Sequence, residues 1–270
     1  DQVFVSEKSP ERIQKFLEDI ADQNDRRIGG GISKEYLHSL DKKTFVRIFS
    51  PRSNRHGISL SVPPFREDTL QKLDVESEDE YDDRLDEIIT TLLLSLEITG
   101  ARKGRISTVL KSLMKKISGK LGAQPLDELL AVWGKVEDYI PSLRGLDLED
   151  FLKGDDKVEF QRSLIGYLEG TGAGWLRGCK LDFDKILRPI GGQTPINVIY
   201  VGHLSIEDQQ YVMARVTSEL DKWMRVSPTP NDKLKLLLAI DELGGSGGKE
   251  SFFPPSAKPI SKPPLMRLVR

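Results

Sequence analysis

The sequence is poor in the side chains that form covalent or metal cross-links. Among its 270 residues it has one cysteine, Cys179, and three histidines, His38, His56 and His203. A single cysteine excludes an internal disulfide framework and a metal cluster built only from cysteine. Three histidines spread along the chain argue against a zinc site, which needs several nitrogen or sulfur ligands at one point.

An excess of one charge and a long apolar run are also missing. The 40 basic and 42 acidic residues leave a net charge of −2, so any DNA contact must come from local patches. No apolar run reaches the roughly 18 residues of a membrane span. The first residues also lack the basic-then-apolar order of a signal peptide. We therefore expect a cytoplasmic protein.

The composition, with 38% hydrophobic and 30% charged residues, is typical of a globular protein. The sequence patterns divide the chain into three parts. The first part, residues 1–67, combines helix and strand signals. Ser9 followed by Pro10 predicts a helix start, and an apolar stripe follows at Ile13, Phe16, Leu17 and Ile20. The β-branched and aromatic stretches 44–49 and 58–62 predict two strands.

The second part, residues 68–180, is predicted to be almost wholly helical. An acidic run enters a helix that Gly100 would end, with a stripe at Leu85, Ile88, Ile89, Leu92, Leu93 and Leu96. A second helix has its stripe at Ile106, Val109, Leu110, Leu113 and Ile117. Further helices are expected around 125–139, 147–153 and 156–169. The lysines outside the second stripe form a solvated helix face or, alternatively, contact DNA phosphates: Lys111, Lys115, Lys116 and Lys120.

The third part, residues 181–270, predicts a strand, a helix and a second strand. The apolar run 196–201 (INVIYV) is typical of a strand buried on both faces. A helix over about 206–225 follows, with its apolar stripe at Val212, Met213, Val216, Leu220, Trp223 and Met224. Residues 234–240 (LKLLLAI) predict the second strand, parallel to the first. The expected fold class is α/β, a parallel-sheet core with a large helical insertion.

The sharpest chemical signal follows the last predicted strand. Asp241 and Glu242 lie at its carboxyl end, the edge where α/β proteins bind ligands. Two carboxylates there fit a Walker B motif, in which Asp241 would hold Mg²⁺ and Glu242 would orient the attacking water. The alternative is an apolar strand that ends in an exposed acidic turn.

No stretch of the chain fits the phosphate-binding loop G-x-x-x-x-G-K-[ST]. GGSGGKES at 244–251 has Leu243 where the first glycine belongs and Glu250 where Ser or Thr belongs, so we interpret it as a loop, either native or a linker. EGTGAG at 169–174 follows a helix and is expected to end it.

Two further features remain open. His203 follows the 196–201 strand and either caps that strand or contacts nucleotide. A basic cluster near the predicted site is either solvated or lines a DNA channel or a subunit interface: Lys258, Lys262, Arg267 and Arg270.

Taken in order, these segments resemble the HerA/FtsK-type ATPases of the HerA-like helicase family. The resemblance lies in INVIYVGHL, in the helix that ends near Trp223, in KLLLAIDEL, and in Ser261-Lys262 followed by Pro264-Leu265. VRIFSPRSNRHGISLSVPPF, within the first part, is similar to a further segment of the family. The resemblance implies a partial P-loop (RecA-like) core, ATP and Mg²⁺ as cofactors, a homo-oligomeric ring, and DNA as partner.

The resemblance also implies that the phosphate-binding loop, a glutamine sensor and any arginine finger lie outside residues 1–270. The first residue is Asp1, and PPLMRLVR starts a helix at the other end without a cap, so we expect the native protein to continue. Two other hypotheses stay open. In one, the 68–180 helices form a non-catalytic module that binds a partner protein. In the other, a degenerate P-loop protein binds a different ligand at the same edge.

Overall fold

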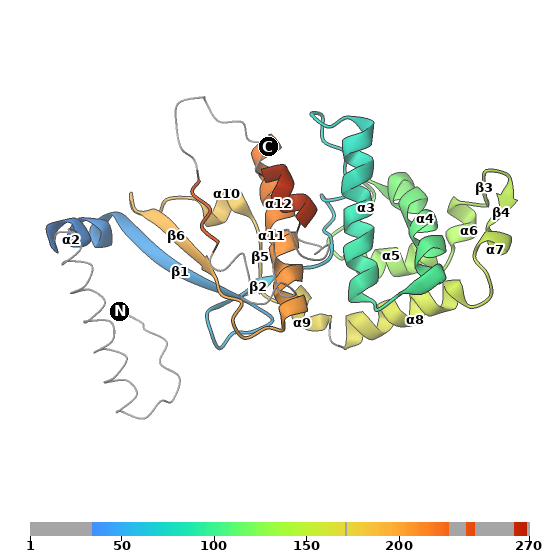
Figure 1. Ribbon diagram of the computed structural model, residues 1–270, viewed down its shortest axis with the longest axis horizontal. Helices are drawn as coiled ribbons and strands as arrows, with labels where there is room; N and C mark the ends of the chain where they lie inside the picture. Colours follow the sequence, from blue (N-terminus) through green and yellow to red (C-terminus); the bar gives the residue numbers. More distant parts are fainter. Residues whose placement is uncertain (1–33, 171, 227–235, 241–261, 269–270) are drawn as a thin grey trace. The chain divides into compact units, whose positions relative to one another are not determined.

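The computed structural model describes residues 34–170, 172–226, 236–240 and 262–268. They belong to two compact units (Figure 1). The sheet unit is drawn from residues 1–61 and 178–203, and the helical unit from residues 62–177 and 204–270. No helix within the described ranges is long and apolar enough to cross a membrane.

The sheet unit is built on four parallel strands in the order β5-β2-β1-β6. Its elements are α2 (Lys34–Lys43), β1 (Thr44–Pro51), β2 (Ile58–Ser61), β5 (Cys179–Lys180), α10 (Phe183–Ile186) and β6 (Thr194–Ile199). β1, β2 and β6 confirm the three strands predicted at 44–49, 58–62 and 196–201. The α/β class with a parallel sheet is therefore correct.

The two faces of the sheet differ. On one face Arg47 lies opposite Asn197 in the β1–β6 register and donates to its Oδ1 at 3.0 Å, and both side chains donate to the Ile186 carbonyl of α10. On the other face Val46 pairs with Ile196 and Ile48 with Val198.

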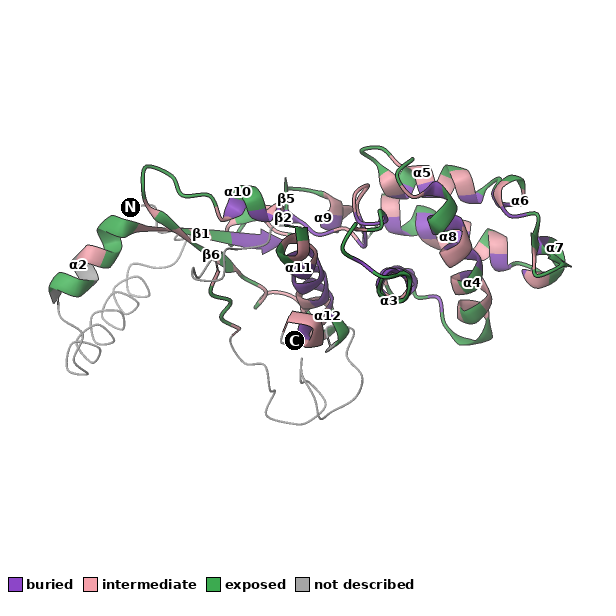
Figure 2. Cartoon of the chain, turned by 90° about the horizontal axis from the view of Figure 1, so that it is seen from above, coloured by how far each residue is buried: buried purple, intermediate pink, exposed green. Residues whose placement is uncertain are grey.

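All four of these aliphatic side chains are exposed, by 60% at Val46, 46% at Ile196, 44% at Ile48 and 41% at Val198. We call these four residues the open face. The prediction that 196–201 is buried on both faces is wrong, because burial alternates along β6 with the two-residue period of a strand. Figure 2 shows that β1 becomes fully buried only towards its carboxyl end.

The helical unit contains helices that the apolar periodicity predicts well. Its elements are α3 (Glu78–Ser95), α4 (Gly100–Ile117), α5 (Pro125–Trp133), α6 (Val136–Tyr139), β3 (Ser142–Leu143), β4 (Leu146–Asp147), α7 (Leu148–Phe151), α8 (Asp156–Glu169), α9 (Ala173–Leu176), α11 (Ile206–Val226) and α12 (Lys262–Leu268). The predicted stripes of α3 and α4 are buried throughout, and the two helices contact each other.

Capping side chains and glycines determine several helix ends, and only some of these ends are predicted correctly from the sequence. Ser77 caps α3 in a reciprocal capping box with Glu80, which satisfies two backbone N–H groups. Gly100 does not end α3, which stops at Ser95; it begins α4 instead. Ser205 accepts a hydrogen bond from the Asp208 backbone N–H at 3.2 Å and so satisfies one of the free N–H groups at the start of α11.

Two predictions for the last part of the chain are corrected. In α11 the buried side extends to Tyr211, Arg215 and Glu219, while Met224 is exposed, because polar partners within the helical unit hold this helix. Residues 236–240 have no strand structure, and Leu237 is 80% exposed. The predicted strand 234–240 and its parallel pairing with 196–201 are therefore absent from the described part of the chain, and β6 pairs with β1 instead.

Candidate functional site

The strands of the sheet unit deliver their carboxyl ends to one edge. Because β1, β2 and β6 are parallel, Pro51, Ser61 and Ile199 end on the same side of the sheet. In α/β proteins this edge, with the loops that follow the strands, is where ligands bind. It is the candidate site.

His203 is fixed at this edge by the end of β1. Its Nε2 lies 2.9 Å from the Pro51 carbonyl oxygen. A carbonyl can only accept, so in the neutral ring the proton sits on Nε2 and Nδ1 is left as an acceptor. That Nδ1 is buried and has no hydrogen-bond partner among the residues that the structure describes. His203 therefore presents an unused acceptor beside the strand ends.

Two aromatic side chains complete a ring cluster around His203. The His56 and His203 ring centroids are 5.0 Å apart, and Tyr200 stacks on His203 at 5.7 Å with an interplanar angle of 19°. Tyr200 also extends the β6 ladder, since its N–H donates to the Phe49 carbonyl at 2.8 Å. A Cβ on Gly202 would come within 3.0 Å of the Tyr200 hydroxyl, so glycine leaves room for that ring.

Neither partner of His203 is predicted from the sequence. Tyr200 lies in the INVIYV run, where its aromatic ring is typical of an apolar strand. His56 lies in the loop between β1 and β2, far from His203 along the chain, and no local pattern connects the two. Their meeting follows from the parallel pairing of β1 with β6, which puts the two loops at the same edge.

The end of β1 carries two more unusual features. The Ser50 side chain is fully buried, and its hydroxyl oxygen has no hydrogen-bond partner in the described ranges. Arg52, which follows the strand, adopts a φ of 60°, a left-handed conformation that costs free energy for a residue with a side chain. Backbone strain of this kind is concentrated at functional sites.

Most of the other predicted site residues lie outside the described residues. These are Asp241, Glu242, Lys258 and Arg270. Lys262 is the first residue of α12. Within the described ranges, no group of three or more metal-ligating side chains could hold an ion.

Arg267 makes ion pairs inside the helical unit. Its Nη1 lies 2.7 Å from Glu87 Oε2, and its Nε donates to Asp221 Oδ2 at 2.9 Å. Burial alone would lower the pKa of Arg267, but the charges of Glu87 and Asp221 outweigh it and raise the pKa. The structure thus gives Arg267 a fixed place between α3, α11 and α12, whereas a DNA contact would require its guanidinium to be free.

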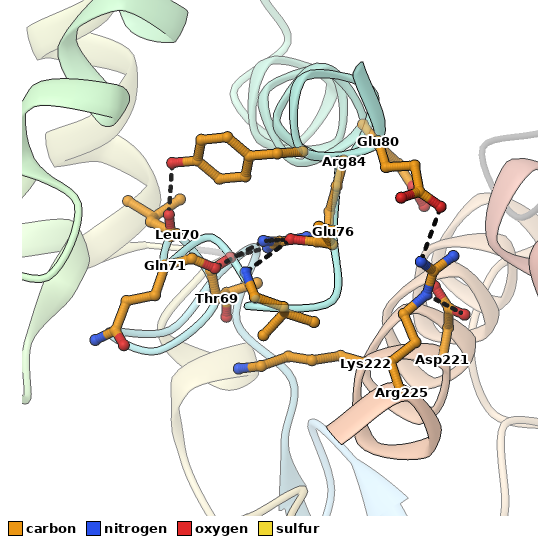
Figure 3. A network of polar contacts seen from close by, with 12 residues as sticks. Thr69, Leu70, Gln71, Glu76, Glu80, Arg84, Asp221, Lys222 and Arg225 are labelled. Atoms are coloured by element: carbon orange, nitrogen blue, oxygen red, sulfur yellow. Dashed lines mark hydrogen bonds and ion pairs between the residues drawn. The ribbon is translucent and has the colours of Figure 1, made fainter. Parts of the chain in front are cut away.

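The α3–α11 side of the helical unit is held by a network of buried charges (Figure 3). Arg84 Nε donates to Glu76 Oε1 at 2.7 Å, and the same guanidinium donates to the Thr69 and Gln71 carbonyls. Burial alone would raise the pKa of Glu76, but the hydrogen bonds from Arg84 and from the Leu73 N–H lower it. This network pins the segment before α3 to the helix and has the character of a structural support.

Three of the four lysines in the predicted basic set, those within α4, make polar contacts. Lys111 donates to Asp86 at 2.7 Å, Lys115 pairs with Asp82, and Lys116 donates to the Tyr139 carbonyl at 2.6 Å. These contacts favour the hypothesis that the lysines form an ordinary solvated helix face over the hypothesis that they bind DNA phosphates.

The sheet unit also has a hollow of about 400 Å³ on the Arg47 side of the sheet, next to α10. Its lining includes Phe49, Ile58 and Ile186, and the Arg47 guanidinium there is already bonded to Asn197 and the Ile186 carbonyl. The lining also includes Cys179 and Lys180, and Lys185 there pairs with Asp182 at 3.2 Å. Because Arg47 and Lys185 are already paired within the sheet unit, the hollow offers few polar groups to orient a small-molecule ligand.

Comparison of the chain with family models, with curated proteins and with solved structures found no match. The assignment of function therefore depends on the motifs in the sequence and on the geometry of the carboxyl edge.

Proposed function

We propose that this chain is part of an ATP-hydrolysing DNA translocase or helicase-like motor of the HerA type. The observation that carries the proposal is the carboxyl edge of the parallel sheet. There β6 leads through Gly202 and His203 into the long helix α11, and the chain then continues to the Asp241-Glu242 pair. Along the chain, a strand, a long helix and an acidic pair in this order are typical of a nucleotide-binding α/β core.

The unused polar atoms at this edge fit a nucleotide and its metal. The buried Ser50 hydroxyl and His203 Nδ1 have no partners in the part of the chain described, as expected where a polar ligand or another segment completes the site. In the proposed motor, Asp241 would hold Mg²⁺ and Glu242 would orient water. Bound Mg²⁺ would supply charge neutralisation of the phosphates. His203 would accept a hydrogen bond through Nδ1, while its Nε2–H donates to the Pro51 carbonyl at the end of β1.

The remaining parts of the proposal follow from the family resemblance. The phosphate-binding loop comes from outside these 270 residues, because no stretch of them fits it. The motor works as a ring on DNA in a cytoplasmic setting, with Lys258, Lys262 and Arg270 facing DNA or a neighbouring subunit.

The test is ATP hydrolysis by the longer protein that contains this chain, with and without DNA. We expect Glu242→Gln to lower kcat by about 100-fold or more, the scale of losing a positioned proton acceptor. The control is Glu207→Gln, an exposed position in the first turn of α11, which should leave kcat unchanged. An absence of ATP hydrolysis, or an unaffected Glu242→Gln variant, would contradict the motor. Steady turnover by the isolated chain would contradict its being only a part.

The helical unit supports a second candidate, a module that binds a partner protein. On α8, Val158 and Ile165 are two turns apart on one side of the helix and are 40% and 48% exposed. Loss of partner binding on deletion of residues 68–180, with nucleotide binding unchanged, would favour this module over the motor.

A further inference from the structure

The loop between β1 and β2 carries exposed cations at the carboxyl edge of the sheet. Arg52, Arg55 and His56 are exposed residues of this loop. The Arg55 guanidinium makes no hydrogen bond or ion pair within the described ranges of the chain. Its charge and its N–H donors are therefore available to a partner that carries anionic oxygen atoms.

The two stretches of sequence that form β1, β2, their loop and β6 contain no acidic residue. Residues 44–61 and 185–203 have neither Asp nor Glu, and their charged side chains are Arg47, Arg52, Arg55, Lys185 and Arg188. The whole chain, by contrast, has a net charge of −2. Positive charge is thus concentrated in these stretches of the sheet unit, as contact with a phosphate backbone requires.

Two aromatic rings lie beside the cations. The His56 ring centroid is 5.4 Å from that of Tyr200 and 5.0 Å from that of His203. Tyr200 is 40% exposed, and His56 is exposed as well. Exposed rings next to arginines are typical of surfaces that bind single-stranded nucleic acids, because bases stack on the rings while the cations contact the phosphates.

The loop is held in place by contacts within the sheet unit. Ser53 Oγ accepts a hydrogen bond from the Arg55 backbone N–H at 3.1 Å. Gly57 brings the end of the loop against β1, since a Cβ there would lie 2.4 Å from the Ile48 carbonyl oxygen. His56, next to Gly57, is further held by its ring contacts. A partner can therefore bind with little loss of conformational entropy in the loop.

We propose that the β1–β2 loop binds a single strand of nucleic acid, with Arg52 and Arg55 at the phosphates and a base stacked on the His56–Tyr200 pair. A small nucleotide fits less well, because it needs a concave site that buries most of its surface, and these groups stand on an exposed loop. A duplex would use the arginines alone, because its bases are already stacked on one another.

This inference goes beyond the proposed motor. The nucleotide of the motor was assigned to the buried atoms Ser50 Oγ and His203 Nδ1, whereas the strand contacts the exposed side chains of the loop. Binding of the strand requires neither ATP nor the phosphate-binding loop that these 270 residues lack. The chain should therefore bind the strand by itself, and failure of ATP hydrolysis in the longer protein would leave this expectation unchanged.

The experiment is a titration of a fluorescent oligo-dT of about 20 nucleotides with the full chain, followed by anisotropy without ATP or Mg²⁺ at several salt concentrations. We expect Arg55→Gln to raise Kd about fivefold or more at low salt. The same substitution should lower the slope of log Kd against log salt by about 0.7, the contribution of one phosphate contact on a single strand. Loss of stacking in His56→Ala should also raise Kd about fivefold or more.

The matched control is Arg188→Gln, which removes the same charge from an exposed residue on the amino-terminal side of β6. It should change Kd by less than about twofold, because one distant charge is largely screened. Arg55→Lys should keep the salt slope of the native chain, since it keeps the charge.

Three results would overturn the proposal. The first is no binding by the native chain, and the second is an equal loss of affinity in Arg55→Gln and Arg188→Gln. The third is a duplex of the same length that binds as tightly as the single strand while His56→Ala has no effect, because stacking would then play no part. Weaker binding of the duplex, together with losses confined to Arg55 and His56, would support the assignment.

Discussion

Asp156 is a buried carboxylate of the helical unit that pairs with two arginines of α4. It is 1% exposed and accepts hydrogen bonds from Arg105 Nε at 2.6 Å, Arg105 Nη2 at 3.0 Å and Arg102 Nε at 3.1 Å. The hydrogen bond from Arg105 lowers the pKa of Asp156 against the opposing effect of burial. The residue stands in the first turn of α8, where a negative charge also complements the helix dipole.

We expect Asp156→Asn to lower the free energy of unfolding by about 2–3 kcal/mol, because a buried acceptor of charged hydrogen bonds loses its charge and part of its bonding. The measurement is urea denaturation at pH 7. The matched control is Asp155→Asn, an exposed neighbour whose side chain makes no cap hydrogen bond and which should change stability by less than about 0.5 kcal/mol. Equal effects of the two substitutions would show that the Arg102–Arg105 cluster is not stabilising.

Few of these side-chain contacts could be predicted from the sequence. The helix 156–169 was predicted at its correct bounds, because apolar periodicity is local. That Asp156 would meet Arg102 and Arg105 of α4 was not predictable, since the contact depends on how α4 and α8 pack. The same holds for His56, Tyr200 and His203, whose approach requires two loops to meet.

At the scale of elements, the β2–β5 pairing depends on Gly178. Its φ is +111°, and a Cβ there would overlap the Ser59 carbonyl of β2. We expect Gly178→Ala to destabilise the sheet unit by roughly 2 kcal/mol or more, because a side chain is disfavoured at this φ and cannot fit against the neighbouring strand.

Gly104 provides the opposite test in the same chain. It lies inside α4, and an added Cβ would meet nothing within 4 Å. Gly104→Ala should therefore stabilise the protein by about 0.5–1 kcal/mol through the lower entropy of the unfolded chain. Thermal unfolding of both variants distinguishes the two effects by sign, and a neutral Gly178→Ala would contradict the close approach of β5 to β2.

Strands were harder to predict than helices for a physical reason. A helix makes its hydrogen bonds within its own segment, so α3 and α4 could be read from spacing alone. A strand needs a partner, and residues 236–240 are without one in the described part of the chain although their sequence has the composition of a strand. β6 found its partner in β1, which is distant along the chain.

For the whole molecule, buried carboxylates determine how stability changes in acid. The pKa of Asp156 and that of Glu76 are both lowered in the folded state. Their stabilisation is fully present above the unfolded pKa values of about 3.9 and 4.3, and it is lost as the pH falls through the lower folded values. Stability from these groups should be flat from pH 7 to about pH 5 and should fall below about pH 4.

The check is the gap in unfolding free energy between the native chain and Asp156→Asn. We expect the gap measured at pH 7 to shrink steadily below about pH 4, because the native carboxylate also loses its charge there. Asp155→Asn serves again as the control and should show no such convergence. A gap that stays constant down to pH 2.5 would mean that the charge of Asp156 does not contribute.

By itself, the sequence determined the helices of the helical unit, the three strands β1, β2 and β6, and the α/β class, because these depend on local periodicity and composition. Only the tertiary structure decided the strand order, the ring cluster around His203, the ion pairs that hold Arg267, and the open face. The reason is that strand pairing and buried charge pairs join residues far apart along the chain. Their free energy is not encoded in any single segment.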